Sequence, residues 1–203
     1  SIPAKYQDEY RNLLKNIQYL SVRELHGAKL IKELTGRDVE VVLDPTLLVT
    51  SEEWLNNVAK NPLSGEKYVL VYTLSGSKYI QELCDNIAGR LGCKVVNMKI
   101  NFRKDDSEKM TDLFDLGPQE WVGLISGASY VVTDSFHGTA FSINFNKPFT
   151  TLVNPVSNMN SRVLSILKIM GLEDRIIYDD GTRKMPKELY VDYTEVNKRM
   201  EEW

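Results

Sequence analysis

Short apolar segments alternate with amphipathic segments along the whole chain, and this alternation constrains the fold more than any other feature. The segment 68–74 is apolar at nearly every position, which is typical of a strand buried on both faces of a parallel sheet. Parallel strands need long crossover connections, and the amphipathic segments between the strands supply them as helices. The pattern predicts an α/β fold: a doubly wound, mainly parallel sheet flanked by helices, in a single Rossmann-like domain over residues 1–203.

The individual elements follow from periodicity, caps and breakers. The predicted strands lie at 17–22, 39–43, 68–74, 95–98, 130–133 and 149–153. The predicted helices lie at 5–16, 26–35, 51–59, 78–91, 118–127, 136–146, 160–170 and 192–202. Residues 101–116 are polar and poorly periodic, so we expect an irregular connection there.

Composition narrows the classes of partner. The net charge of −3 gives no global attraction to nucleic acid or to an anionic membrane, so an anion must be bound by a local arrangement. No apolar run approaches the roughly 18 residues that span a bilayer, and the first residues are polar, so we expect no membrane span and no signal peptide. Cys84 and Cys93 match no metal motif; we expect two buried or half-buried thiols in a reducing compartment and no metal site.

The junction that follows the strand at 130–133 is the strongest candidate site. It carries Asp134, Ser135, Phe136, His137, Gly138 and Thr139. A helix that begins here has free backbone N–H groups and a partial positive charge, Gly138 lets a ligand approach closely, and Ser135 and Thr139 add hydroxyl donors. Such a junction is suited to a phosphate or a carboxylate, and His137 could exchange a proton near neutral pH. The alternative is that Asp134 or Ser135 only caps the helix and His137 packs beneath a loop.

Three further groups follow predicted strands or open predicted helices. Arg23 follows the first strand and could bind an anion through a bidentate fork, or it could form a salt bridge with Glu24 or another acid. Ser75 and Gly76 follow the strand at 68–74 and form either a small phosphate nest or a turn. Arg162 opens a helix and either reaches an anion or is solvated. These groups meet the junction at 134–139 only if the strand order brings them to one edge of the sheet.

Several of these segments resemble motifs of the polysaccharide pyruvyl transferase family. The segment 131–149, VVTDSFHGTAFSINFNKPF, is similar to the signature of that family. The segments SVRE at 21–24 and VVLDPTLL at 41–48 resemble its SVR(D/E)…DPTLL pattern. PQEW at 118–121 resembles its P-x-E-W helix, and NSR at 160–162 its N-x-R helix. The matches occur in order from about residue 20 to 176.

The resemblance implies a function as well as an architecture. It implies one lobe, the C-terminal one, of a two-lobed GT-B-like enzyme that moves pyruvate from phosphoenolpyruvate onto sugar hydroxyls as a ketal. The partners would be phosphoenolpyruvate as donor, a sugar or lipid-linked oligosaccharide acceptor and the N-terminal lobe of the same protein, with no further cofactor. We expect a cytoplasmic location, peripheral to the membrane where glycans are assembled. The alternatives are a nucleotide-sugar glycosyltransferase lobe and a non-catalytic module that binds a sugar or an anion.

The candidate residues then acquire roles. We expect His137 to act as the general acid–base and Arg23 to stabilise charge, both as catalytic residues. The residues expected to bind substrate are Asp134, Ser135, Phe136, Gly138, Thr139, Arg162, Ser75 and Gly76.

Overall fold

A computed structural model describes residues 2–75, 77, 79–99, 110–156 and 160–202; Gly76 lies outside the described residues. The main sheet contains β3 (Tyr68–Tyr72), β4 (Lys94–Met98), β5 (Thr111–Leu113), β6 (Tyr130–Thr133), β7 (Phe149–Val153) and β8 (Ile176–Tyr178). Its strand order is β5-β4-β3-β6-β7-β8, and every neighbouring pair is parallel. This arrangement confirms the predicted parallel α/β fold.

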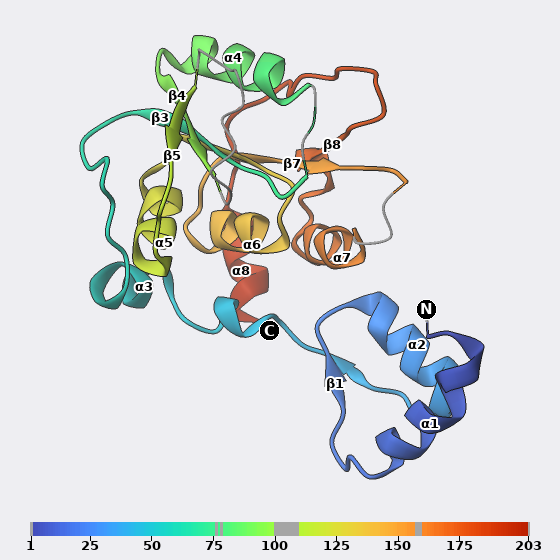
Figure 1. Ribbon diagram of the computed structural model, residues 1–203. Helices are drawn as coiled ribbons and strands as arrows, with labels where there is room; N and C mark the ends of the chain where they lie inside the picture. The colour runs from blue at the N-terminus through green and yellow to red at the C-terminus, as the bar shows by residue number, and fades with distance from the viewer. Residues whose placement is uncertain (1, 76, 78, 100–109, 157–159, 203) are drawn as a thin grey trace.

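Two cores lie on opposite faces of this sheet. The helices of the domain are α3 (Ser51–Asn57), α4 (Ile80–Leu91), α5 (Pro118–Gly127), α6 (Phe136–Asn144), α7 (Ser161–Met170) and α8 (Thr194–Glu201), with short 3-10 turns at Pro45–Leu47 and Glu173–Arg175. Side chains alternate along β3, so Tyr68 and Leu70 enter the core with α5, α6 and α7, while Val69 and Val71 enter the core beneath α4 (Figure 1). Cys84 is buried and Cys93 is half-buried, as expected, and both thiols are free.

The direction of strand addition reverses at the centre of the sheet. The chain builds outward through β3, β4 and β5 and then returns to place β6 on the other side of β3. The connections that follow β3 and β6 therefore lead to helices on opposite faces of the sheet, and α/β sheets bind ligands at the carboxyl edge of such a switch point.

The first part of the chain forms a separate small sheet. It contains α1 (Ala4–Lys15), β1 (Ser21–Val22), α2 (Leu25–Thr35) and β2 (Glu40–Val41), and β1 pairs with β2 alone. We call residues 2–42 the N-terminal unit. The sequence analysis made a meeting of Arg23 with the junction at 134–139 conditional on the strand order, and that condition is not met by a shared sheet edge, because β1 joins no strand of the main sheet.

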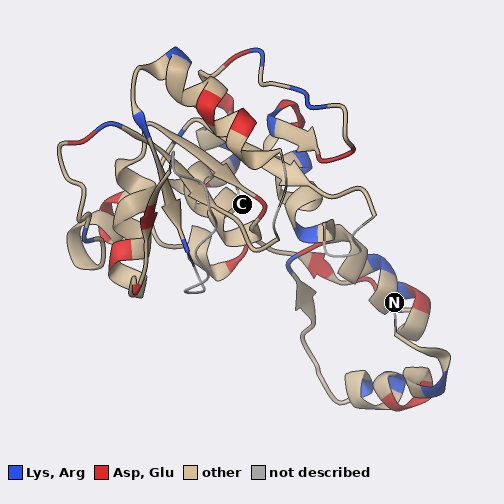
Figure 2. Ribbon diagram, turned by 45° about the horizontal axis from the view of Figure 1, so that its top comes forward, with Lys and Arg blue, Asp and Glu red and all other residues tan. Residues whose placement is uncertain are grey.

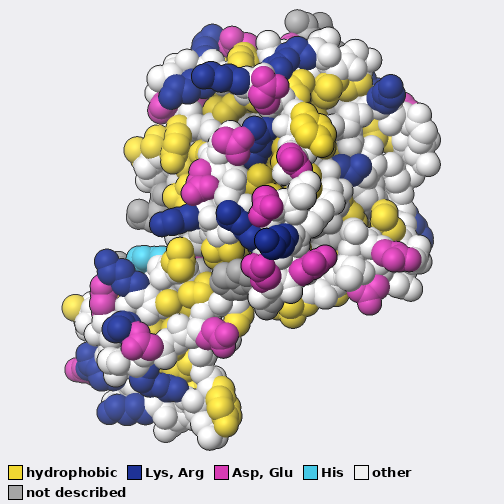
Figure 3. Space-filling model, turned by 180° about the vertical axis from the view of Figure 1, so that it is seen from behind, with side chains coloured by type: hydrophobic (Ala, Val, Ile, Leu, Met, Phe, Trp, Pro, Cys, Tyr) yellow, Lys and Arg dark blue, Asp and Glu magenta, His cyan; other side chains and the backbone are white. Residues whose placement is uncertain are grey.

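The N-terminal unit has little core of its own. Leu34 is the one buried side chain among residues 2–42, and α1 buries none. The unit projects from the rest of the molecule (Figure 1), and hydrophobic side chains lie on the face of it that Figure 3 shows. It is connected to the main domain by the hydrogen bond that Ser161 Oγ donates to Glu24 Oε2 at 2.7 Å, and α2 packs beside α7.

Two edge strands fall where the sequence predicts none. β5 lies within the expected irregular connection 101–116, of which residues 101–109 lie outside the described residues, and β8 follows the short turn Glu173–Arg175. Each has three residues, so its pairing depends on the neighbouring strand more than on a local pattern.

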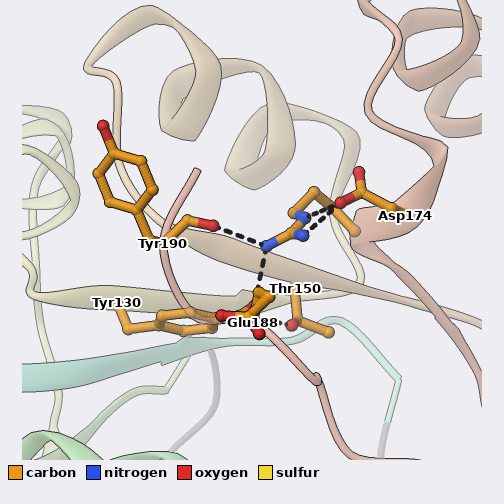
Figure 4. A network of polar contacts seen from close by, with 6 residues as sticks. Tyr130, Thr150, Asp174, Glu188 and Tyr190 are labelled. Atoms are coloured by element: carbon orange, nitrogen blue, oxygen red, sulfur yellow. Dashed lines mark hydrogen bonds and ion pairs between the residues drawn. The ribbon is translucent and has the colours of Figure 1, made fainter. Parts of the chain in front are cut away.

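An arginine anchors the irregular segment after β8. The Arg175 guanidinium donates to the Glu188 and Tyr190 carbonyl oxygens at 3.0 and 3.3 Å and pairs with Asp174 (Figure 4). Basic and acidic residues are interspersed along the helices elsewhere in the ribbon (Figure 2). None of the helices in the described part of the chain is long and apolar enough to cross a membrane.

Candidate functional site beside the first turn of α6

The loops after β3 and β6 meet at the carboxyl edge of the sheet. The Asp134 carboxylate accepts hydrogen bonds from the backbone N–H groups of Leu74 and Ser75, at 2.6 and 2.8 Å, and from the Ser75 hydroxyl. The structure thus brings together two of the clusters singled out in the sequence. The Asp134 carboxylate thus accepts three hydrogen bonds within the protein, and these bonds hold the loop after β3 against the end of β6.

The first turn of α6 is packed closely against the end of β6. Ser135 caps the helix and accepts from the Gly138 N–H at 3.4 Å. A Cβ on Gly138 would lie 2.3 Å from Thr133 Oγ1, so glycine is required here by helix–strand packing rather than by the approach of a ligand. Thr139 is fully buried, and its hydroxyl donates to the Ser135 carbonyl at 3.0 Å. Gly138 and Thr139 therefore support the helix start from beneath, on the side away from solvent.

His137 is the exposed residue of this turn. Its neighbours on both sides, Phe136 and Gly138, are buried, whereas His137 is open to solvent. The Phe136 and His137 rings lie edge to face with their centroids 5.3 Å apart. The prediction of a titratable ring at this edge of the sheet agrees with the position of His137, and the alternative of a histidine packed beneath a loop does not.

A small polar cavity lies on the α7 side of the turn, and we call it the polar cavity. It has a volume of about 200 Å³ and is lined by Leu74, Ser75, Asp134, Phe136, Leu152, Asn154, Asn160, Arg162 and Val163. The Arg162 guanidinium lies 5.2 Å from the centroid of the Phe136 ring, a cation–π distance. Among the described residues, no carboxylate forms an ion pair with Arg162. The polar cavity thus contains a half-buried, unpaired cation at the switch point of the sheet.

A larger cavity lies on the α5 side of the same turn, and we call it the aromatic cavity. It has a volume of about 480 Å³ and is lined by Trp54, Val58, Tyr72, Leu116, Gly117, Pro118, Trp121, Val122, His137 and Phe141. Phe141 contacts both indoles, with ring centroids 5.1 Å away in each case, and Trp121 also stands edge-on to Tyr72 at 5.3 Å.

Sequence reasoning did not identify this cavity. Trp54 and Trp121 have the spacing and apolar neighbours of core residues, and they do pack against the core. Both also remain half-buried and line a cavity, a distinction that periodicity cannot make.

Arg23 lies outside the two cavities. Its guanidinium pairs with the buried carboxylate of Asp44, so the structure shows the salt-bridge alternative with a partner other than Glu24. Burial alone would raise the pKa of Asp44, but hydrogen bonds from Thr46 and the pairing with Arg23 outweigh burial and lower that pKa. The Arg23 side chain stays 45% exposed, and the neighbouring Glu24 accepts from Ser161, the residue before Arg162. The SVRE and NSR segments therefore meet in space.

Comparison with solved structures supports the fold. The chain is similar to a structure described as the glycotransferase of kitacinnamycin, at 14% identity and a TM-score of 0.50, over 98% of this chain and 56% of that one. It is also similar to the E. coli heptosyltransferase WaaC with ADP, at 15% identity and a TM-score of 0.40, over 70% of this chain and 50% of that one. At 14% identity the likeness to the first structure concerns the fold alone, and it agrees with the Rossmann-like α/β architecture described above. The chain spans about half the length of these two proteins.

Comparison with protein families identifies the chain more closely. A search among curated proteins finds no match. The sequence profile described as "Polysaccharide pyruvyl transferase" matches residues 1–155, a span that includes the SVRE segment, the α5 motif and the whole first turn of α6. The chain therefore belongs to the polysaccharide pyruvyl transferase family.

Proposed function

We propose that this chain is the donor-binding lobe of an enzyme that transfers pyruvate from phosphoenolpyruvate onto two hydroxyls of a sugar, forming a ketal and releasing phosphate. The observation that supports this most directly is the unpaired Arg162 guanidinium in the polar cavity beside the exposed His137. Family membership supports a transferase that acts in polysaccharide modification.

The polar cavity suits a small dianion. Arg162 would hold the donor phosphate or carboxylate through two parallel N–H···O bonds, and the Phe136 ring beneath it limits where the guanidinium can point. The first N–H groups of α6 add a partial positive charge on the same side. Ser75, Asn154 and Asn160 line the same cavity and make its wall polar.

His137 would move the protons of the reaction. Its imidazolium protonates the methylene carbon of the donor, and an oxocarbenium-like centre forms at the enol carbon. The first sugar hydroxyl adds to that carbon and returns its proton to the imidazole. The second hydroxyl displaces phosphate, which leaves with the second hydroxyl proton. Arg162 would stabilise the charge that develops on the leaving phosphate, since Arg23 lies outside both cavities and pairs with Asp44.

The N-terminal unit would join a further lobe of the same protein. A two-stranded parallel sheet is not stable in isolation, and α1 exposes Tyr6, Tyr10 and Leu13. Additional strands and helices that cover this face would complete the sheet and place a second wall opposite α6. The acceptor would be a sugar or a lipid-linked oligosaccharide that enters between the two walls, in the cytoplasm or at its membrane surface.

Calorimetric titration of the chain with phosphoenolpyruvate tests the donor site. We expect saturable binding that weakens about 10- to 100-fold in Arg162→Ala, because a charge-assisted hydrogen bond contributes about 1.5–3 kcal/mol. Arg183→Ala is the matched control, since Arg183 is an exposed arginine that pairs with Glu82.

The same titration separates the alternatives. Equal binding by Arg162→Ala and Arg183→Ala would contradict the assignment of the polar cavity. Tighter binding of a nucleotide sugar such as UDP-glucose than of phosphoenolpyruvate would favour a glycosyltransferase lobe. Arg23→Ala would show whether Arg23 contacts the donor or only pairs with Asp44.

A further inference from the structure

We propose that the aromatic cavity is the acceptor subsite and that it binds a neutral pyranose ring, with ring hydroxyls directed at His137 and Tyr72. This inference rests on the proposed function, because it assigns the second substrate of the same reaction. It places part of acceptor recognition in this lobe, on the opposite side of the α6 turn from the donor.

The charges of the two cavities differ in the way that the two substrates differ. The polar cavity holds the Arg162 guanidinium, which is unpaired among the described residues. The aromatic cavity is lined by two ionisable side chains, the His137 imidazole and the Tyr72 phenol. A phosphate or a carboxylate in the aromatic cavity would lose water without gaining a permanent cation, which is costly. A neutral ring with apolar C–H faces and a few hydroxyls suits an apolar site that has a few polar groups, and 480 Å³ lies in the range of about 300–1,000 Å³ for such sites.

The Tyr72 hydroxyl is available to a ligand. Four tyrosines are buried in the described part of the chain, and the hydroxyl of each forms a hydrogen bond. Tyr68 bonds Leu124, Tyr79 bonds Lys184, Tyr130 bonds Thr150 and Tyr193 bonds Lys147. Tyr72 is half-buried at the end of β3, and its hydroxyl has no hydrogen-bond partner within the described ranges. A half-buried phenol that lines a cavity is a ready donor and acceptor for a sugar hydroxyl.

The walls of the cavity are held in place before any ligand binds. Trp54 Nε1 donates to the Thr46 carbonyl at 3.2 Å, and Phe141 lies against both indoles. Trp121 is fixed between Phe141 and Tyr72. A preformed aromatic surface costs little entropy to order on binding, which favours a rigid ring as the ligand.

The tryptophans supply the signal for a test. The chain has three tryptophans, and two of them, Trp54 and Trp121, line this cavity. We would titrate the chain with methyl β-D-glucopyranoside and methyl β-D-galactopyranoside and follow intrinsic fluorescence. We expect a saturable change that survives in Trp203→Phe. In Tyr72→Phe, affinity should fall about three- to tenfold, the loss of one hydrogen bond. Tyr190→Phe is the control, because Tyr190 is exposed.

Three outcomes would overturn the inference. They are the absence of any fluorescence change with either glycoside, equal affinities in Tyr72→Phe and Tyr190→Phe, and displacement of a bound glycoside by phosphoenolpyruvate. The proposed function is tested independently: it is contradicted if phosphoenolpyruvate does not bind, or if its affinity is the same in Arg162→Ala as in the wild-type chain. Tyr72→Phe should leave the affinity for phosphoenolpyruvate unchanged, so the two titrations report on different cavities.

Discussion

The protein contains two parallel sheets that differ in burial. In the main sheet, β6 and β7 are buried at every position, whereas β1 and β2 of the N-terminal unit have no buried residue. A parallel sheet needs cover on both faces, and α1, which accompanies β1 and β2, buries no side chain.

This difference distinguishes the region that stabilises the fold from the region that is attached to it. The main sheet has a core on each face, and both cavities lie on its carboxyl edge. The N-terminal unit contributes Arg23 and Glu24, which connect it to Asp44 and Ser161. We infer that the folded state and the chemistry depend on the main sheet, while the N-terminal unit depends on what it joins. Paired substitutions, one in each region, test this inference.

The two histidines of the chain give the largest expected difference, because one lies in each region. His137→Ala should lower turnover by about 10²–10⁴, the usual contribution of a general acid–base. His26→Ala should leave turnover unchanged, because His26 is an exposed residue on α2. The measurement is phosphate release from phosphoenolpyruvate by the enzyme that contains this chain. A loss smaller than tenfold in His137→Ala would remove the assigned role.

Two leucines compare the cores. Leu70 is fully buried in β3, so Leu70→Ala should lower the free energy of unfolding by about 2–5 kcal/mol. Leu34 is the buried residue of the N-terminal unit. Leu34→Ala should lower the free energy of unfolding by less than about 1 kcal/mol, because little packed structure surrounds the Leu34 side chain. Urea denaturation followed by circular dichroism measures both. Equal effects would mean that the two regions unfold as one cooperative unit.

The sequence predicted the main sheet better than its edges or the N-terminal unit. The predicted strands at 130–133 and 149–153 match β6 and β7 in both bounds, because burial on both faces produces continuous apolar runs. The strand predicted at 17–22 shortens to two residues, since Ile17 and Tyr19 find no sheet and remain exposed. The local sequence pattern indicates which residues can form a strand, but hydrogen bonding to a neighbouring strand determines which of them do.

The candidate site was predictable in part for a related reason. Asp134 and Ser75 meet because both follow strands that prove to be neighbours. Residue type could not show that the Thr139 hydroxyl faces the sheet while His137 faces solvent, because this depends on how α6 is rotated against β6. The aromatic cavity depends on residues from three helices and a strand, and no single segment records it.

Two glycines in first helical turns test the packing in each region. Gly138→Ala should destabilise the protein by about 1–3 kcal/mol, because the new Cβ would lie 2.3 Å from Thr133 Oγ1 and α6 must shift. Gly27→Ala in α2 meets side-chain atoms no closer than 3.4 Å, so alanine should stabilise that helix by about 0.5–1 kcal/mol. Thermal unfolding measures the pair. If Gly138→Ala left the thermal stability unchanged, the first turn of α6 would be free to shift, and the walls of both cavities would shift with it.

The smallest expected effect concerns the contact between the regions. Asp44→Asn keeps an acceptor for Thr46 and removes the charge that pairs with Arg23. Since Arg23 is 45% exposed, solvent screens the pair, and we expect a loss below about 1 kcal/mol at pH 7. Asp38→Asn is the control, because Asp38 is an exposed partner of Lys32 within the N-terminal unit.

The pH dependence identifies the cause of that loss. The folded-state pKa of Asp44 lies below its ordinary value of 3.8, so its charge contributes stability above that value and the contribution disappears as pH falls through the lowered pKa. Urea unfolding of the wild-type chain and of Asp44→Asn should therefore differ at pH 7, and the difference should shrink as the pH falls below 3.8 and the Asp44 carboxylate takes up its proton. A difference that persists at low pH would assign the effect to the hydrogen-bond geometry around Thr46, and the ion pair between the regions would then contribute nothing to their attachment.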